Sequence, residues 1–127
     1  MRIVLRLAAI YNLVWGIWVG LFPQAFFGLV GMEPINHVVI WQGMGMVIGV
    51  YGLGYWWASY SPLKQWPLVA VGFLGKFFGP LGYVISLALG TVDPKFGYTL
   101  LTNDLIWWVP FLLILRAAYR SHGFKIE

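Results

Sequence analysis

"WPLVAVGFLGKFFGPLGYVISLALG", residues 66 to 90, is a run of 25 residues in which Lys76 is the only charged side chain. A helix needs about 20 predominantly apolar residues to cross the hydrocarbon core of a bilayer. The run is longer than that requirement, which permits a tilt in the membrane. It therefore predicts a transmembrane helix, and the lysine inside it needs its own explanation.

The composition places the whole chain in the same class. Hydrophobic residues make up 61% of the 127 residues and charged residues only 9%, whereas a soluble domain carries roughly 25% charged residues. A chain of this length cannot bury so much apolar surface in one core. Three further apolar runs lie at about 3 to 22, 37 to 60 and 100 to 117. We therefore predict an all-α integral membrane protein, a four-helix transmembrane bundle that forms a single domain over residues 1 to 127.

The segments between the spans differ in character. "PQAFFGLVGMEPIN", residues 23 to 36, predicts a short interfacial helix after the first span, because Pro23 suits a first helical turn and a Phe pair follows it. "SPLKQ", residues 61 to 65, predicts a tight turn. "TVDPKFGYT", residues 91 to 99, predicts a loop because of its Asp-Pro and Gly punctuation.

The basic residues predict the orientation. Six of them fall at the amino end, in residues 61 to 65 and in the carboxyl tail: Arg2, Arg6, Lys64, Arg116, Arg120 and Lys125. With four spans these regions share one side, and the positive-inside rule then places both termini in the cytoplasm. The net charge of +4 is thus a topology signal. It favours anionic membrane lipids as partners and argues against nucleic acid.

Lys76 is the most deeply placed charge. It follows Trp66 by ten residues, which at about 1.5 Å per residue is roughly 15 Å along the helix. A charge at that depth costs on the order of 3 kcal/mol unless it faces a partner or a watery cavity. Small residues at helical spacing predict a helix contact face around it, and these residues are Gly72, Gly75, Gly79 and Gly82. We therefore expect Lys76 to point into the bundle.

Pro80 adds a backbone feature beside the lysine. A proline lacks the N–H that would bond the carbonyl four residues earlier, and that carbonyl belongs to Lys76. Such breaks are tolerated in membrane helices where neighbours satisfy the backbone. We expect a bend and a free acceptor next to the ammonium.

Asp104 lies in "LTNDLIWWVPFLLILR", residues 100 to 115, three residues ahead of a Trp pair and a long apolar run. One hypothesis is an intramembrane ion pair with Lys76, which neutralises both charges where water is scarce. The other is that Asn103 or Asp104 caps the fourth helix. The sequence leaves both open.

Other polar residues are candidates for a ligand or ion pathway: Asn12, Gln42 and Tyr83. Each also has an ordinary interpretation as an interhelical hydrogen bond. His37 and His122 fall on opposite sides of the membrane, and the chain has no cysteine. The sequence therefore predicts no metal site and no cofactor. It also shows no nucleophile with a nearby base, so no catalytic residue is assigned and an enzyme is disfavoured.

Four stretches carry a resemblance to a known group: "AAIYNLVWGIWVGLFP", "WQGMGMVIGVYGLGYW", "VGFLGKFFGPLG" and "LTNDLIWWVPF". They resemble small bacterial inner-membrane proteins, and the four-span layout is similar to the DoxX-like group. The resemblance implies a four-helix bundle, associated in some relatives with quinone-linked or thiol redox complexes. The absence of cysteine argues against a direct thiol role here.

Two functions follow from these features. The first is an accessory or binding protein for an apolar ligand, a lipid or a quinone, or for a larger membrane complex. The alternative is a small oligomeric transporter or channel that uses Lys76 and Asp104. The sequence favours the first, because it shows no internal repeat and few polar residues inside the spans.

Overall fold

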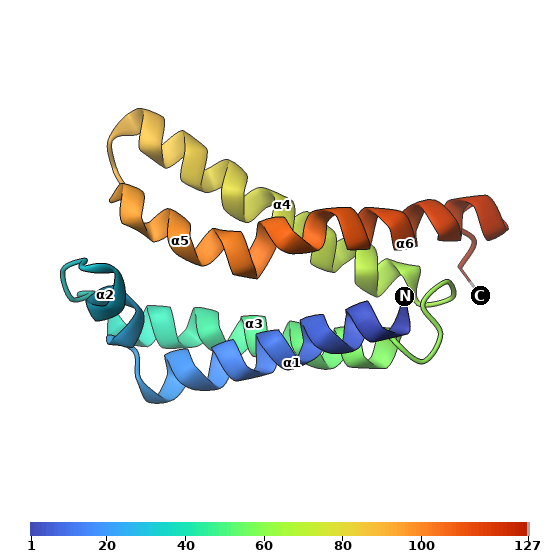
Figure 1. Ribbon diagram of the computed structural model, residues 1–127, viewed down its shortest axis with the longest axis horizontal. Helices are drawn as coiled ribbons and strands as arrows, with labels where there is room; N and C mark the ends of the chain where they lie inside the picture. The colour runs from blue at the N-terminus through green and yellow to red at the C-terminus, as the bar shows by residue number, and fades with distance from the viewer. Residues whose placement is uncertain (127) are drawn as a thin grey trace.

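The computed structural model describes residues 1–126 and is all-α over that range. Four helical segments of the described chain are long and apolar enough to cross a membrane: α1 (Arg2–Leu21), α3 (Val38–Ala58), α4 (Trp66–Leu89) and the run Pro94–His122 (Figure 1). The predicted four-helix bundle is therefore confirmed, and the chain is a small multi-pass membrane protein.

The fourth helical run is longer than predicted. It consists of a 3₁₀ turn (Pro94–Phe96), α5 (Gly97–Leu100), a π-helical segment (Leu101–Leu105) and α6 (Ile106–His122). The prediction of a loop over residues 91 to 99 is thus wrong from residue 94 onward, and the span does not begin at residue 100. The Asp93 side chain accepts a hydrogen bond from the Lys95 N–H at 2.9 Å. An aspartate cap followed by proline starts a helix as readily as it marks a turn.

The other elements lie close to their predicted bounds. The short helix after the first span is α2 (Ala25–Val30), and it ends at Gly31 with a φ of 75°, the left-handed conformation that glycine adopts at helix ends. Residues 61 to 65 form turns, as predicted. The prediction that α2 lies in the membrane interface is not addressed by the structure.

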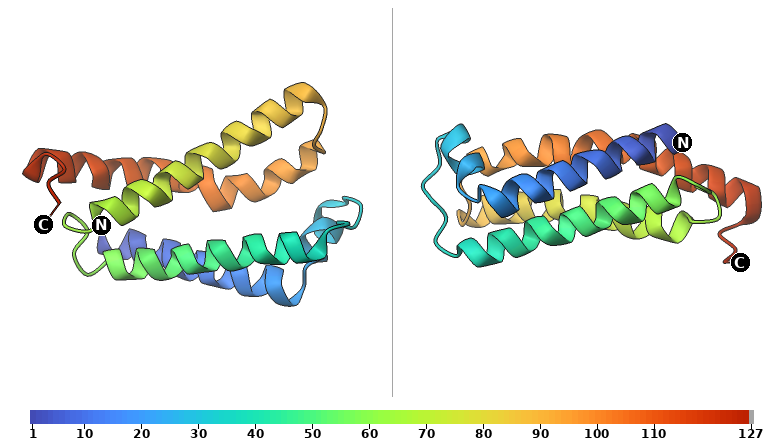
Figure 2. Two further views of the ribbon diagram at one scale, coloured as in Figure 1. Left: turned by 180° about the vertical axis from the view of Figure 1, so that it is seen from behind. Right: turned by 90° about the horizontal axis from the view of Figure 1, so that it is seen from below.

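The long helices pair as two hairpins, α1 with α3 and α4 with the run 94–122 (Figures 1 and 2). Both termini and residues 61 to 65 gather at one end, which we call the terminal end. There the His122 ring nitrogen Nε2 lies 2.8 Å from the Leu63 carbonyl oxygen. Toward the opposite end, which carries α2, the two hairpins diverge (Figures 1 and 2).

Glycines allow α1 and α3 to approach at backbone distance. A Cβ atom on Gly16 would lie 2.6 Å from the Gly45 carbonyl oxygen, and one on Gly52 would lie 2.8 Å from the Ala9 carbonyl oxygen. Neither position has room for a side chain. The glycines of the first hairpin therefore let α1 and α3 pack backbone against backbone.

The glycines of α4 behave differently from the predicted contact face. The space beside Gly72 is filled by the Tyr55 ring, and Gly79 lies against Asp104. At Gly75 and Gly82 a Cβ atom would meet nothing within 4 Å. The predicted contact face is thus wrong for those two positions, because the divergence of the hairpins leaves them open.

Two clusters of buried side chains hold the hairpins together. The first lies toward the terminal end, joins all four long helices, and contains Leu5, Ala8, Ala9, Tyr55, Ala58, Val69, Trp107, Phe111 and Ile114. The second lies at the α2 end and contains Trp15, Val19, Phe26, Phe27 and Trp41, with Phe96 packed against it. The bundle is thus sealed at both ends, with a less filled region between them.

Candidate functional site

A cavity of about 360 Å³ lies between the two hairpins. We call it the central cavity. Its walls are mostly apolar, with Trp15, Trp41, Met44, Ile48 and Phe96 among the lining residues. Its polar lining side chains are Asn12, Tyr51, Tyr55, Lys76, Thr99, Asn103 and Asp104. An apolar pocket with a few convergent polar groups is typical of a small-molecule site.

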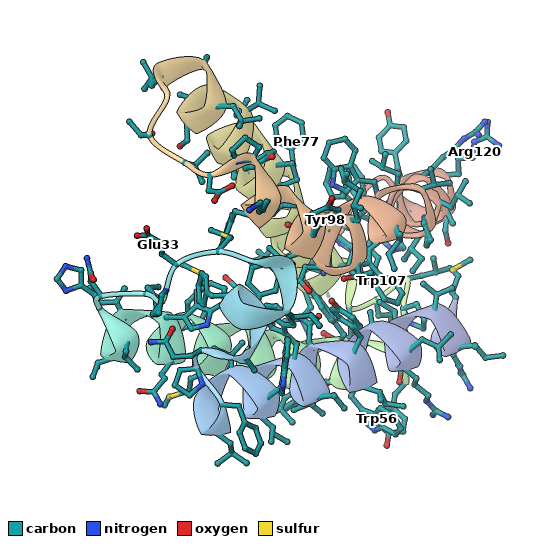
Figure 3. All side chains as sticks on the ribbon, turned by 60° about the vertical axis from the view of Figure 1, so that its left-hand side comes forward. Glu33, Trp56, Phe77, Tyr98, Trp107 and Arg120 are labelled. Carbon is teal, nitrogen blue, oxygen red and sulfur yellow. The ribbon has the colours of Figure 1, made fainter. Side chains whose placement is uncertain are left out.

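Lys76 reaches this cavity from the middle of α4. Its residue is only 4% exposed, and its ammonium donates a hydrogen bond to the Asn103 carbonyl oxygen at 2.7 Å. The same nitrogen lies 5.4 Å from the centre of the Tyr55 ring, with Trp107 and Phe111 also within 6 Å. Figure 3 shows Trp107 in the space between the hairpins. The prediction that Lys76 points into the bundle is confirmed, and its charge is held by a carbonyl and by ring faces.

Asp104 does not cap the fourth helix. It lies inside the π-helical segment, which follows seven residues of 3₁₀ turn and α-helix that begin at Pro94, hence the cap hypothesis is wrong for it. Asn103 does not cap the helix either, since its side chain donates to the Thr99 hydroxyl at 3.0 Å. The role that the sequence offered to both residues belongs to Asp93.

The carboxylate of Asp104 is a neighbour of Lys76 without bonding it directly. The two charges are close enough to interact electrostatically. Within the described residues, however, no ion pair of 4.0 Å or less joins them, and the ammonium bonds Asn103 instead. The Asp104 carboxylate rests against Gly79, where a Cβ atom would lie 3.0 Å from its oxygen Oδ2. The hypothesis of a direct ion pair is therefore wrong, although both charged side chains line the cavity.

The Lys76 carbonyl, which has no donor within α4, accepts a hydrogen bond from another helix. Pro80 lies inside α4 and cannot supply the N–H that the Lys76 carbonyl would normally accept. The indole nitrogen of Trp108 donates to that carbonyl at 2.8 Å. Trp107 donates in the same way to the Thr102 carbonyl, also at 2.8 Å. The wide π-helical turn frees carbonyls of this kind, so the Trp pair stabilises both irregular stretches.

Three sides of the central cavity are closed. At the α2 end, the Phe96 ring packs 6.0 Å from the rings of Phe26 and Trp41, and the Lys95 ammonium donates to the Gly31 carbonyl at 3.0 Å. Toward the terminal end, the first buried cluster fills the interior. Between α1 and the π-helical segment, the Tyr11 hydroxyl bonds the side chains of Thr102 and Asn103.

The fourth side, between α3 and α4, is open. There the cavity lining includes exposed residues from both helices, Met44 and Tyr51 from α3 and Gly75 and Gly79 from α4. The cavity that Lys76 lines therefore opens on the side of the bundle, between α3 and α4.

The remaining sequence candidates separate into two groups. Asn12 lines the central cavity and also donates to the Ile48 carbonyl at 3.1 Å. Gln42 instead donates to the Gly20 carbonyl at the end of α1, at 2.9 Å, and Tyr83 donates to the Pro94 carbonyl at 2.7 Å. Neither of these two lines the cavity. The structure thus brings together Lys76, Asp104, Asn103 and Asn12, and leaves Gln42 and Tyr83 as structural hydrogen bonds.

Sequence reasoning missed several residues of the site. Thr99 is 4% exposed and lies one turn before Asn103, a spacing that the assumed loop over residues 91 to 99 concealed. Trp41 is 6% exposed, and its indole nitrogen has no hydrogen-bond partner among the described residues. No sequence signal marks such a lone donor, because it depends on how α2 and Phe96 pack around it.

Comparisons of the chain with protein-family models, with curated proteins and with solved structures found no match. The resemblance to the DoxX-like group stays a prediction.

Proposed function

We propose that this protein is an accessory or binding protein that holds one apolar ligand, a lipid or a quinone, in its central cavity. The observation that carries the proposal is the combination of apolar walls, a polar end at Lys76, and an opening between α3 and α4. A ligand from the bilayer keeps its tail in the apolar part and places a polar head beside the lysine. The protein acts alone, as a homo-oligomer, or within a larger membrane complex.

The polar end supports recognition of a head group. The Lys76 ammonium has three N–H donors, of which one is given to Asn103. Lys76 and Asp104 both line the cavity. A polar group in low dielectric contributes strongly when it is paired and is costly when it is not. The site therefore favours a bound head group over an empty apolar slot.

The basic residues support an orientation for this binding protein. The six that predicted the topology lie in α1, in residues 61 to 65, in the last turns of α6 and at Lys125, and these regions meet at the terminal end. We place that end in the cytoplasm of a cell with an inner membrane. The central cavity then opens in the half of the bilayer that faces away from the cytoplasm.

The transporter alternative has less support. It needs a polar path from the central cavity to the terminal end, and that half of the bundle is filled by side chains with almost no exposed surface, such as Leu5, Val69 and Phe111. A path requires these helices to separate. The opening toward lipid requires no rearrangement, so it favours binding.

Native mass spectrometry tests the proposed function. The protein is extracted in a mild detergent and activated until loosely attached lipid is lost. We expect the chain to retain one small lipid-soluble molecule, which extraction and fragmentation then identify. A chain that retains no added mass, under conditions that preserve a known lipid-binding membrane protein, contradicts the proposal.

A further inference from the structure

We infer that the central cavity selects a single-chain lipid with an uncharged head that both donates and accepts hydrogen bonds, such as a hydroxyl-bearing glycerol ester. The inference rests on the proposed function and narrows its ligand class. The polar end of the cavity contains the Asp104 carboxylate, which accepts no hydrogen bond from a described residue, and the Lys76 ammonium, which uses one of its three N–H groups. A hydroxyl group matches both.

The acceptor is the Asp104 carboxylate. It interacts electrostatically with Lys76, but no described residue donates a hydrogen bond to it. Its oxygen lies against the bare backbone of Gly79, and it faces the cavity. A carboxylate that is partly removed from water without a donor is costly. A ligand hydroxyl that donates to Asp104 removes that cost, whereas a ligand with acceptors only does not.

The donor is the Lys76 ammonium. One of its three N–H groups is given to the Asn103 carbonyl, and ring faces of Tyr55, Trp107 and Phe111 surround it on other sides. The residue also lines the cavity. An N–H that points into the cavity can reach an oxygen of the ligand, and an ester or hydroxyl oxygen supplies that acceptor.

The charges of the site argue against a charged head. Among the described residues, Lys76 and Asp104 are the only Lys, Arg, Asp or Glu side chains that line the cavity, so their formal charges cancel. A phosphate that bonds Lys76 is repelled by Asp104, and an amine that bonds Asp104 is repelled by Lys76. A zwitterionic head must lose the hydration of two charges about 15 Å along a membrane helix. That desolvation is far more costly than for a hydroxyl.

The size of the cavity sets the number of chains. Its volume of about 360 Å³ lies at the small end of the range for ligand pockets, which runs from about 300 to 1,000 Å³. A small head and the first part of one acyl chain fit this volume, and the rest of the chain leaves between α3 and α4. Two acyl chains and a phosphate head need more space.

A panel of four lipids with the same oleoyl chain tests the inference. The probes are monooleoylglycerol, which donates and accepts; methyl oleate, which only accepts; oleoyl lysophosphatidic acid, which is anionic; and oleoyl lysophosphatidylethanolamine, which is zwitterionic. Each is titrated into delipidated protein, and the dissociation constant is read by native mass spectrometry. We expect monooleoylglycerol to bind about tenfold or more tightly than each of the others, the effect of one hydrogen bond to a charged group.

A charge variant adds an independent readout. Asp104→Asn leaves the cavity with the single charge of Lys76. The affinity for lysophosphatidic acid relative to that for monooleoylglycerol should therefore rise about tenfold. The control is Glu33→Gln, which removes an exposed carboxylate that follows α2 and lies outside the cavity (Figure 3). The control should leave the ratio unchanged.

The outcomes separate the inference from the proposed function. If lysophosphatidic acid, the zwitterionic probe or methyl oleate binds the parent protein as well as monooleoylglycerol does, the inference is overturned while the cavity remains a ligand site. An Asp104→Asn variant that folds and keeps the parent ratio overturns it as well. If no probe binds and the purified protein carries no molecule, the proposed function fails together with the inference. The panel on the parent protein decides the matter even where the variant does not fold.

Discussion

The indole nitrogen of Trp108 donates a hydrogen bond to the carbonyl oxygen of Lys76 at 2.8 Å. This carbonyl is the one that Pro80 leaves without a helical donor. The ammonium of the same lysine donates in the opposite direction, to the Asn103 carbonyl at 2.7 Å. Lys76 of α4 is thus bonded twice to the fourth helical run, through its carbonyl to Trp108 of α6 and through its ammonium to Asn103 of the π-helical segment.

Replacing Trp108 with phenylalanine should leave the Lys76 carbonyl without a donor. The ring contact with Phe77, at 5.7 Å between centroids, can persist, so the loss reports on the hydrogen bond. We expect a loss of about 1 to 3 kcal/mol in the free energy of unfolding, the cost of a buried unsatisfied group. The measurement is equilibrium unfolding in mixed detergent micelles.

Trp66→Phe is the matched control for this change. The Trp66 indole donates to the Lys125 carbonyl at an exposed site. Removing this hydrogen bond should therefore lower the free energy of unfolding by no more than about 0.5 kcal/mol. Equal losses for the two variants would show that the Trp108 bond contributes no more than an exposed one.

The electrostatic neighbours Lys76 and Asp104 should be coupled in stability. Lys76→Met leaves the carboxylate uncompensated and the Asn103 carbonyl without its donor. Because the two charges interact without a direct ion pair, we expect a coupling of about 1 to 2 kcal/mol, below the 3 to 5 kcal/mol lost when one partner of a buried pair is removed. A double-mutant cycle of Lys76→Met and Asp104→Asn measures it. If the two single substitutions lower the free energy of unfolding by amounts that simply add in the double mutant, the two charges do not interact.

The close contact of α1 and α3 should fail when Gly52 gains a side chain. A Cβ atom there would lie 2.8 Å from the Ala9 carbonyl oxygen, so Gly52→Leu must push the helices apart and should cost about 3 kcal/mol. Gly43→Leu in the same helix is the control, because a Cβ atom at Gly43 meets nothing within 4 Å. Because leucine has a higher helix propensity than glycine, Gly43→Leu should be neutral or slightly stabilising. A stable Gly52→Leu variant is incompatible with this packing.

The proposed orientation can be tested with single thiols, because the chain has no cysteine. Ser61→Cys lies in the turn at the terminal end, and Thr91→Cys lies between α4 and the fourth helical run. A membrane-impermeant maleimide added outside the cell membrane should label residue 91 at once and residue 61 only after the membrane is opened. Labelling of residue 61 in sealed cells reverses the orientation.

Much of the fold follows from the sequence, because the number and bounds of membrane helices depend on local hydropathy. The burial of Lys76 could also be predicted, since a lysine at that depth is costly in contact with lipid and usually faces the interior of the bundle. The start of the fourth span could not be predicted, because the dipeptide Asp93-Pro94 is equally typical of a turn and of the first residues of a helix. Only the conformation of the residues that follow distinguishes the two.

Contacts between helices were harder to predict than the helices themselves. The sequence offered glycines at close spacing in two spans, and nothing local says which set meets a partner helix. Gly52 packs against backbone while Gly75 is open, a difference that arises from the divergence of the hairpins. Likewise the orphan carbonyl of Lys76 was predictable from Pro80, but its donor, Trp108, lies 32 residues away.

The most direct test of the ligand site is to fill the central cavity and measure whether the ligand is lost. Gly75 lines the cavity and Gly82 does not, yet a Cβ atom at either position meets nothing within 4 Å. Gly75→Leu and Gly82→Leu therefore add the same side chain to the same helix, and neither change causes a clash at its Cβ atom. Native mass spectrometry of the two variants, purified side by side with the parent protein, should find the bound molecule in the parent and in Gly82→Leu and only a small fraction of it in Gly75→Leu. Full retention by Gly75→Leu, or equal loss from both variants, would contradict binding in this cavity.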